Sequence, residues 1–124
     1  MASRKVIWIS WLISVIPSLL LAFSSFLKFQ GSPEVVKGFA HLGIPASMMM
    51  PLAILEISCV VIYLIPPTSV LGAILLAGYM GGAMLTHWRA GEPFWMQFTV
   101  GVVFWLGLYL REDRLKPLIP IRRS

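Results

Sequence analysis

The segment Ile44–Ile65, IPASMMMPLAILEISCVVIYLI, decides the fold, because it contains only one charged residue, Glu56. A helix of about 22 residues is long enough to cross a hydrocarbon core of about 30 Å. Pro66 and Pro67 follow directly and end the helical pattern. The segment therefore predicts a membrane-spanning helix that carries a single carboxylate.

Three further apolar runs lie on either side of this segment. The first covers about 22 residues without a charge, too long for a cleaved signal peptide, and the last, about 17 residues, is near the minimum for a span. A short amphipathic helix is expected over Pro33–Leu42, with Ser32 as its N-cap. The sequence thus predicts an all-α, four-helix transmembrane bundle, with helices at approximately 6–27, 44–65, 69–87 and 94–110.

The composition agrees with a single membrane domain over residues 1–124. Hydrophobic residues make up 58% of the 124 residues, charged residues make up 12%, and the mean hydropathy is +0.85. A soluble domain of this size cannot bury so much apolar surface, so the surplus is expected to face lipid. The net charge of +5 is concentrated at the chain ends, which favours anionic lipid headgroups over nucleic acid as the partner.

The basic residues also predict the orientation in the membrane. With four spans, both termini lie on the same side, and basic residues favour the cytoplasmic side. Seven of the ten Lys and Arg residues fall on the side of the termini, so both termini are expected in the cytoplasm. These are Arg4, Lys5, Arg111, Arg114, Lys116, Arg122 and Arg123; Lys28, Lys37 and Arg89 fall on the other side.

Glu56 is expected near the middle of its helix, where an ionised carboxylate facing lipid would cost several kcal/mol. It should therefore face the bundle interior. Two other predicted helices offer polar stripes at helical spacing, and Tyr79 should lie at the depth of Glu56. The stripes are Ser14, Ser18, Leu21, Ser25 and Lys28 in the first helix, and Tyr79, Ala83, Thr86 and His87 in the third.

These residues predict an outward-opening polar cavity with Glu56 and Tyr79 at its lower wall. Its mouth would carry Lys28, His41, His87 and Arg89. Such a cavity suits a small ligand, a quinone-like headgroup or a lipid headgroup. Purely structural roles are the alternatives: Glu56 would fix helix packing, Lys28 would extend to the membrane surface, and Arg89 would pair with Glu92.

Three smaller features complete the set of candidates. Gly78 and Gly82 form a GxxxG motif, which predicts close helix packing, either within the bundle or in a homo-oligomer. The one cysteine, Cys59, allows neither an internal disulfide nor a CxxC pair. The cysteine and the two histidines lie at unrelated depths, so no metal site is expected.

The strings LLAGYMGGAMLTHWRAGEPF (75–94) and WLGLYLREDRLKPLIPIRR (105–123) resemble the DoxX-like family of small bacterial membrane proteins. The segments SSFLKF, HLGIP and LAILEISCVVIYLIPP carry the resemblance into the first half. It implies a four-helix bundle in the bacterial cytoplasmic membrane, associated in some members with quinone-linked redox complexes. The positions that match the family's motif are Lys28, His41, Gly43, Pro45, Glu56, Tyr79, Thr86 and His87.

Three functions remain open at this point. The first is an accessory or ligand-binding subunit of a quinone- or lipid-linked membrane redox system, with a bound quinone or lipid and a membrane or soluble redox partner. The second is a structural or assembly protein without chemistry. The third is an acid–base enzyme that acts on a lipophilic substrate, with Glu56 and His87 as proton donor and acceptor.

Overall fold

The computed structural model describes residues 3–123, which contain five α-helices, three single-turn 3₁₀ helices and no strand. The described chain is therefore all-helical, and four of its α-helices are long and one is short. The α-helices are α1 (Arg4–Gln30), α2 (Pro33–His41), α3 (Met49–Leu64), α4 (Ser69–Arg89) and α5 (Trp95–Arg111); the 3₁₀ turns are η1 (Ala46–Met48), η2 (Pro66–Thr68) and η3 (Asp113–Leu115).

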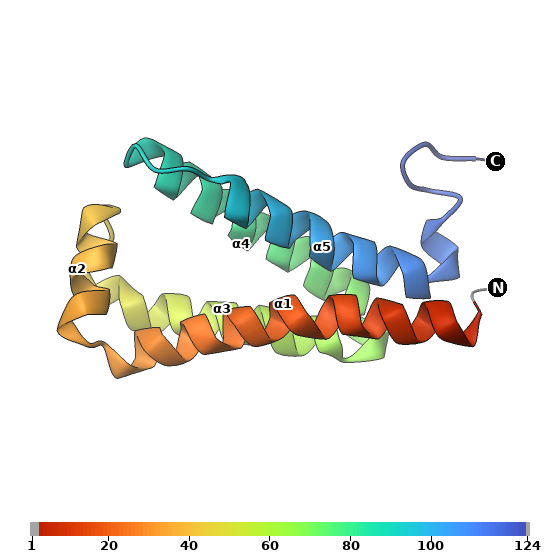
Figure 1. Cartoon of the computed structure of the whole chain (residues 1–124), viewed down its shortest axis with the longest axis horizontal. Coiled ribbons are helices and arrows are strands. Elements are labelled where there is room, and N and C mark those ends of the chain that lie inside the picture. The colour runs from red at the N-terminus through yellow and green to blue at the C-terminus, as the bar shows by residue number, and fades with distance from the viewer. Residues whose placement is uncertain (1–2, 124) are drawn as a thin grey trace.

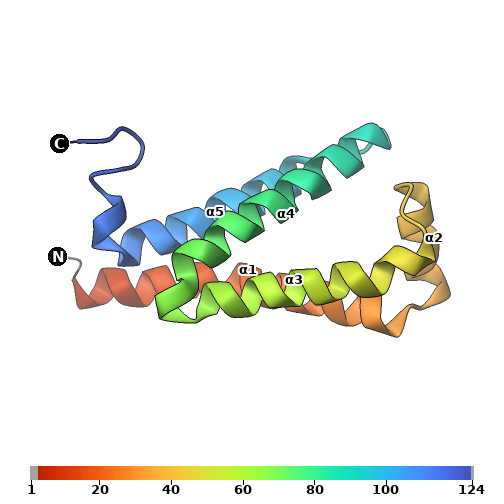
Figure 2. The same cartoon turned by 180° about the vertical axis from the view of Figure 1, so that it is seen from behind.

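The long helices form two pairs that diverge along the length of the molecule. Helix α1 packs against α3 and α5, and α4 packs against the same two helices. Figures 1 and 2 show one layer of α1 and α3 and a second layer of α4 and α5, which meet near the termini and separate towards α2. The short helix α2 stands at the open end.

Two glycines allow the close approach of the helices near the termini. A Cβ atom on Gly107 of α5 would collide with the Ser14 side chain of α1, and one on Gly72 of α4 would collide with the backbone of Tyr63 in α3. The buried Tyr63 hydroxyl donates a hydrogen bond to the Phe104 carbonyl at 2.6 Å and lies 3.0 Å from Ser14 Oγ. Tyr63 therefore connects α3 to both α1 and α5.

The outer surface of the helices is apolar. Three segments are long and apolar enough to cross a membrane: Arg4–Gln30, Ala46–Leu64 and Pro66–Arg89. Large hydrophobic side chains along them are exposed, such as Ile16, Leu19 and Ile74. Water would make this exposure unfavourable, whereas lipid accommodates it, so the chain is a multi-pass membrane protein.

The helix boundaries agree with the predicted ones within three residues, except at the start of the second span. There the α-helix begins at Met49, preceded by η1, and not at Ile44. The later start places Pro51 in the first turn of the helix, where its missing N–H group leaves no intrahelical hydrogen bond unmade. Helix α2 and its Ser32 cap, which accepts a hydrogen bond from Val35 N at 3.4 Å, were predicted correctly.

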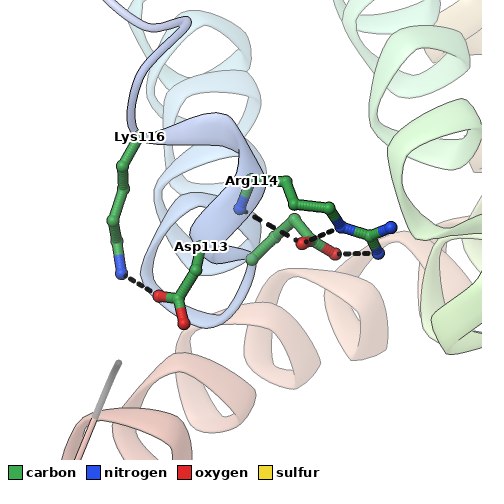
Figure 3. Close-up of polar contacts among 4 residues, drawn as sticks. Asp113, Arg114 and Lys116 are labelled. Atoms are coloured by element: carbon green, nitrogen blue, oxygen red, sulfur yellow. Dashed lines mark hydrogen bonds and ion pairs between the residues drawn. The ribbon is translucent and has the colours of Figure 1, made fainter.

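Helix α5 ends in a tight charged turn. Arg114 donates hydrogen bonds through Nε and Nη2 to the two carboxylate oxygens of Glu112, at 2.9 and 3.2 Å, and Lys116 pairs with Asp113 at 2.7 Å. Figure 3 shows both pairs, which are exposed. The Arg114 hydrogen bonds lower the pKa of Glu112. These contacts lie at the same end of the molecule as the N-terminus (Figure 1).

Candidate functional site

A buried ion pair joins the first and second long helices. The Lys28 ammonium lies 2.8 Å from Glu56 Oε1, and the two side chains are only 4% and 2% exposed. Ser25 Oγ donates a second hydrogen bond to the same oxygen at 2.8 Å, and Lys28 donates another to Ser24 Oγ at 2.8 Å. Glu56 thus has the buried partner that an interior carboxylate requires.

The position of Lys28 corrects the prediction that it would lie at the mouth of the cavity. Lys28 is in the last turn of α1, which Gly31 ends in a left-handed conformation with φ +59°. Glu56 lies only about two turns beyond the start of α3, because that helix begins at Met49. The lysine side chain can therefore reach the carboxylate by turning inward. The other predicted members of the stripe on α1, from Ser14 to Ser25, are buried as expected.

Helix α2 covers this ion pair from the open end. The Lys28 ammonium lies 5.4 Å from the centroid of the Phe39 ring, a distance at which the ring face attracts a cation. Phe39 and Lys28 both border a cleft of about 1360 Å³ between the helices. The α2 segment therefore forms a wall of the site and not only a connection along the membrane surface.

The cleft brings all seven predicted ligand candidates together. Lys28, His41, Glu56, Tyr79, Thr86, His87 and Arg89 all border it. Tyr79 and Glu56, which were predicted to lie at a common depth, border the same cleft. Most of the remaining lining is apolar, from residues such as Leu55, Ile74 and Val100. The site is thus a largely apolar cleft with a small polar cluster.

The imidazole of His87 has a partner at each ring nitrogen. Nδ1 lies 2.8 Å from the Ala83 carbonyl, and Nε2 lies 3.4 Å from the side-chain nitrogen of Gln97 in α5. A carbonyl can only accept, so the hydrogen is on Nδ1, and Nε2 of the neutral ring accepts from the Gln97 amide. Thr86 is held differently, since its hydroxyl donates to the Gly82 carbonyl at 2.7 Å.

Two polar contacts cross the open end between the layers. His41 Nε2 at the end of α2 lies 3.0 Å from Glu92 Oε1, and Arg89 Nη2 donates to the Leu42 carbonyl at 3.1 Å. The structural alternative for Arg89, a surface pair with Glu92, is not formed, because Glu92 pairs with His41 and Arg89 bonds to Leu42. The contacts connect the loop after α2 with the loop between α4 and α5.

The GxxxG glycines do not pack against another helix of this chain. A Cβ atom at Gly78 or Gly82 would meet nothing within 4 Å, and both positions border the cleft. Packing within the bundle was one reading of this motif, and Gly72 and Gly107 make those close contacts instead. An oligomer interface at Gly78 and Gly82 stays a prediction.

Several residues of the site were not singled out from the sequence. Ser24 does not fall on the predicted polar stripe of α1. Phe39 and Gln97 reach the cleft through the packing of α2 and α5. Gln97 had one available signal, since it is an isolated amide in an apolar run. Within residues 3–123, no three His, Cys, Asp or Glu side chains gather into a group that could hold a metal ion.

The arrangement favours hydrogen bonding to a polar group that enters an apolar cleft. Lys28 and Tyr79 offer donors, whereas Glu56 offers an acceptor, and all three border the same space. A few convergent polar groups in an apolar pocket are typical of small-molecule sites.

Comparisons with known proteins identify the family of this chain. No curated protein and no solved structure matches it. A family model described as the DoxX-like family matches residues 12–109, which include the ion pair, the cleft-facing side of α4 and most of α5. The chain therefore belongs to the DoxX-like family.

Proposed function

We infer that this protein binds the polar headgroup of a lipophilic, quinone-like molecule as an accessory subunit of a membrane redox system. It would be a four-helix transmembrane bundle of the bacterial cytoplasmic membrane with both termini in the cytoplasm. A membrane-bound or soluble partner would supply the electrons, and the cleft would hold the ligand. The single domain over residues 1–124 would then serve binding alone.

The buried pair of Lys28 and Glu56 beside the cleft is the observation that carries this proposal. Burying two charges costs more than most ion pairs return in stability, so an apolar pair would have served packing alone at least as well. An ammonium and a phenol at the wall of an apolar cleft suit the carbonyl oxygens of a benzoquinone ring. Glu56 and His87 are the groups available to accept or donate a proton there.

Binding of a tail-free ring tests the proposal directly. The purified protein in mild detergent is titrated by calorimetry with 2,3-dimethoxy-5-methyl-1,4-benzoquinone. Wild-type protein and the control Ser18→Ala, which alters a buried serine of α1 outside the cleft, should bind equally. Tyr79→Phe and the charge-neutral double variant Lys28→Met/Glu56→Leu should bind at least about tenfold more weakly, because each loses one or two hydrogen bonds to the ring.

Two results would reject this function. One is the absence of binding to the wild-type protein. The other is equal affinity in the double variant, provided that it elutes as a monodisperse species like the wild type. Either result would favour the second candidate, an assembly protein, because the open glycine face of α4 offers room for another helix.

That second candidate has its own test. Gly82→Leu adds a large side chain at a position where a Cβ atom would meet no atom within 4 Å. If the face holds a partner helix, this variant should lose a complex that the wild type keeps on native mass spectrometry. Gly38→Leu, which adds the same side chain to an unobstructed position of α2, is the matched control.

A further inference from the structure

A second cavity lies along α4 and α5, and it is almost entirely apolar. Its volume is about 520 Å³, and small residues line part of it, among them Ala77 and Gly81 of α4 and Gly101 of α5. Side chains of α5 border it from Gln97 to Tyr109, a length of about 18 Å at 1.5 Å per residue. This groove is an open apolar depression along α5 that is long enough for a hydrocarbon chain.

The groove and the cleft of the candidate site share two lining residues, Met80 and Gln97. Met80 is 5% exposed, and a methionine adapts its conformation more readily than other apolar side chains. Gly101 lies beside it, since a Cβ atom there would be 3.6 Å from Met80 Cβ. The wall between the two cavities is thus thin and built from a flexible side chain.

Gln97 adds a polar observation at the same place. Its amide nitrogen lies 3.4 Å from His87 Nε2, and its carbonyl oxygen is buried with no hydrogen-bond partner among the described residues. A buried amide oxygen without a partner is unfavourable. Among the described residues, the Gln97 side chain is thus held only by its long contact with His87, at the place where the two cavities meet.

We propose that Met80 and Gln97 form a lateral passage between α4 and α5 through which the hydrocarbon tail of the ligand leaves the cleft and lies in the groove. This inference rests on the proposed function and narrows the ligand to an amphiphile with one polar ring and one long chain. The ring lies near Lys28 and Glu56, and the chain follows α5 towards Ile119 and Pro120, which border the far end of the groove.

The test compares a decyl-substituted benzoquinone with the same ring lacking a tail. The wild type should bind the decyl form at least about tenfold more tightly, the gain from burying about two methylene groups beyond partition into detergent. A Cβ atom at Gly81 meets nothing within 4 Å, and one at Gly101 makes only an ordinary contact with Met80. Gly81→Leu and Gly101→Leu should therefore fill part of the groove. Each should abolish the gain and leave the affinity for the tail-free ring unchanged.

The control is Leu85→Phe, which adds apolar bulk at an exposed position of α4 that borders neither cavity. Equal affinities of the wild type for the two quinones would overturn the passage while leaving the headgroup site intact. So would Gly81→Leu and Gly101→Leu variants that weaken both quinones alike.

If neither quinone binds, the proposed function fails, and a diazirine-bearing palmitate then decides on the passage alone. Photolabelled peptides that contain Met80 and Gln97, with labelling lost in Gly81→Leu, would support it. Labels spread over α1 and α3, unchanged in that variant, would overturn it.

Discussion

The Lys28 ammonium in the last turn of α1 lies 2.8 Å from the Glu56 carboxylate in α3, and both side chains are almost completely buried. Their charges compensate each other at a depth where either alone would be unfavourable. Because the pair also borders the cleft, a ligand that competes for the ammonium would meet a group that is already desolvated. Such a group forms stronger interactions than one at a solvated surface.

Removing one partner of this pair should destabilise the protein strongly. Lys28→Met leaves Glu56 as a buried, unpaired charge, for which a loss of about 3–5 kcal/mol is expected. The double variant Lys28→Met/Glu56→Leu should regain most of this loss, because no charge is left without a partner. Unfolding of each variant in mixed micelles measures the free energies, and equal stability of the single and double variants would contradict this account.

Replacing glycine by alanine should change the stability of the protein in opposite directions at different positions on the helices. Gly107→Ala and Gly72→Ala each introduce a Cβ atom into occupied space, so a loss of about 1–3 kcal/mol is expected. Gly78→Ala meets no atom and should be neutral or stabilising, since alanine favours the helix. Thermal unfolding in detergent compares the three variants. A destabilised Gly78→Ala protein would show that this glycine packs against a partner.

The predicted orientation can be read from cysteine accessibility in intact cells. In a Cys59→Ala background, a cysteine at Glu34 should react with a membrane-impermeant maleimide, because that loop is predicted to face outward. A cysteine at Pro67, in the exposed turn before α4, should react only after the cells are lysed. The reverse pattern would place both termini outside.

The stability of the turn after α5 should depend weakly on pH. The hydrogen bonds from Arg114 lower the pKa of Glu112, so their stabilising contribution is complete above the unfolded pKa and disappears as the pH falls through the lower, folded value. Arg114→Gln should return the pKa of Glu112 towards its usual value in a carboxyl-carbon NMR titration. Arg122→Gln removes the same charge from an exposed position of the C-terminal segment and serves as the control; an equal shift there would contradict a direct bond.

Hydropathy and length were sufficient to predict the long helices and the inward-facing stripe of α1. The reason is that lipid selects strongly against exposed polar groups, so the polar positions of an apolar helix indicate its interior face. The same reasoning placed Glu56, Tyr79 and His87 in one cleft. Their use in binding stays a prediction.

The pairing of polar groups was harder to predict, because it depends on where helices begin and how they approach. Helix α3 begins at Met49 and not at Ile44, so Glu56 lies closer to the start of its helix than predicted and within reach of Lys28. Spacing along one helix contains no information about contacts between loops, so the bonds of His41 with Glu92 and of Arg89 with Leu42 were missed. Likewise, a GxxxG pattern does not reveal which glycines touch a neighbour.

The hydrogen bond of Tyr63 to Phe104 ties the last turn of α3 to α5. This end of α3 lies where the layers meet, away from α2 (Figure 1). Because α-helices bend little, a wider separation of the two layers at the α2 end would require the layers to rotate about this bonded end. Such a rotation would also have to break the contacts of His41 with Glu92 and of Arg89 with Leu42, which bridge the layers at the open end. A group that separates the two layers at the α2 end would therefore also change the packing near the termini.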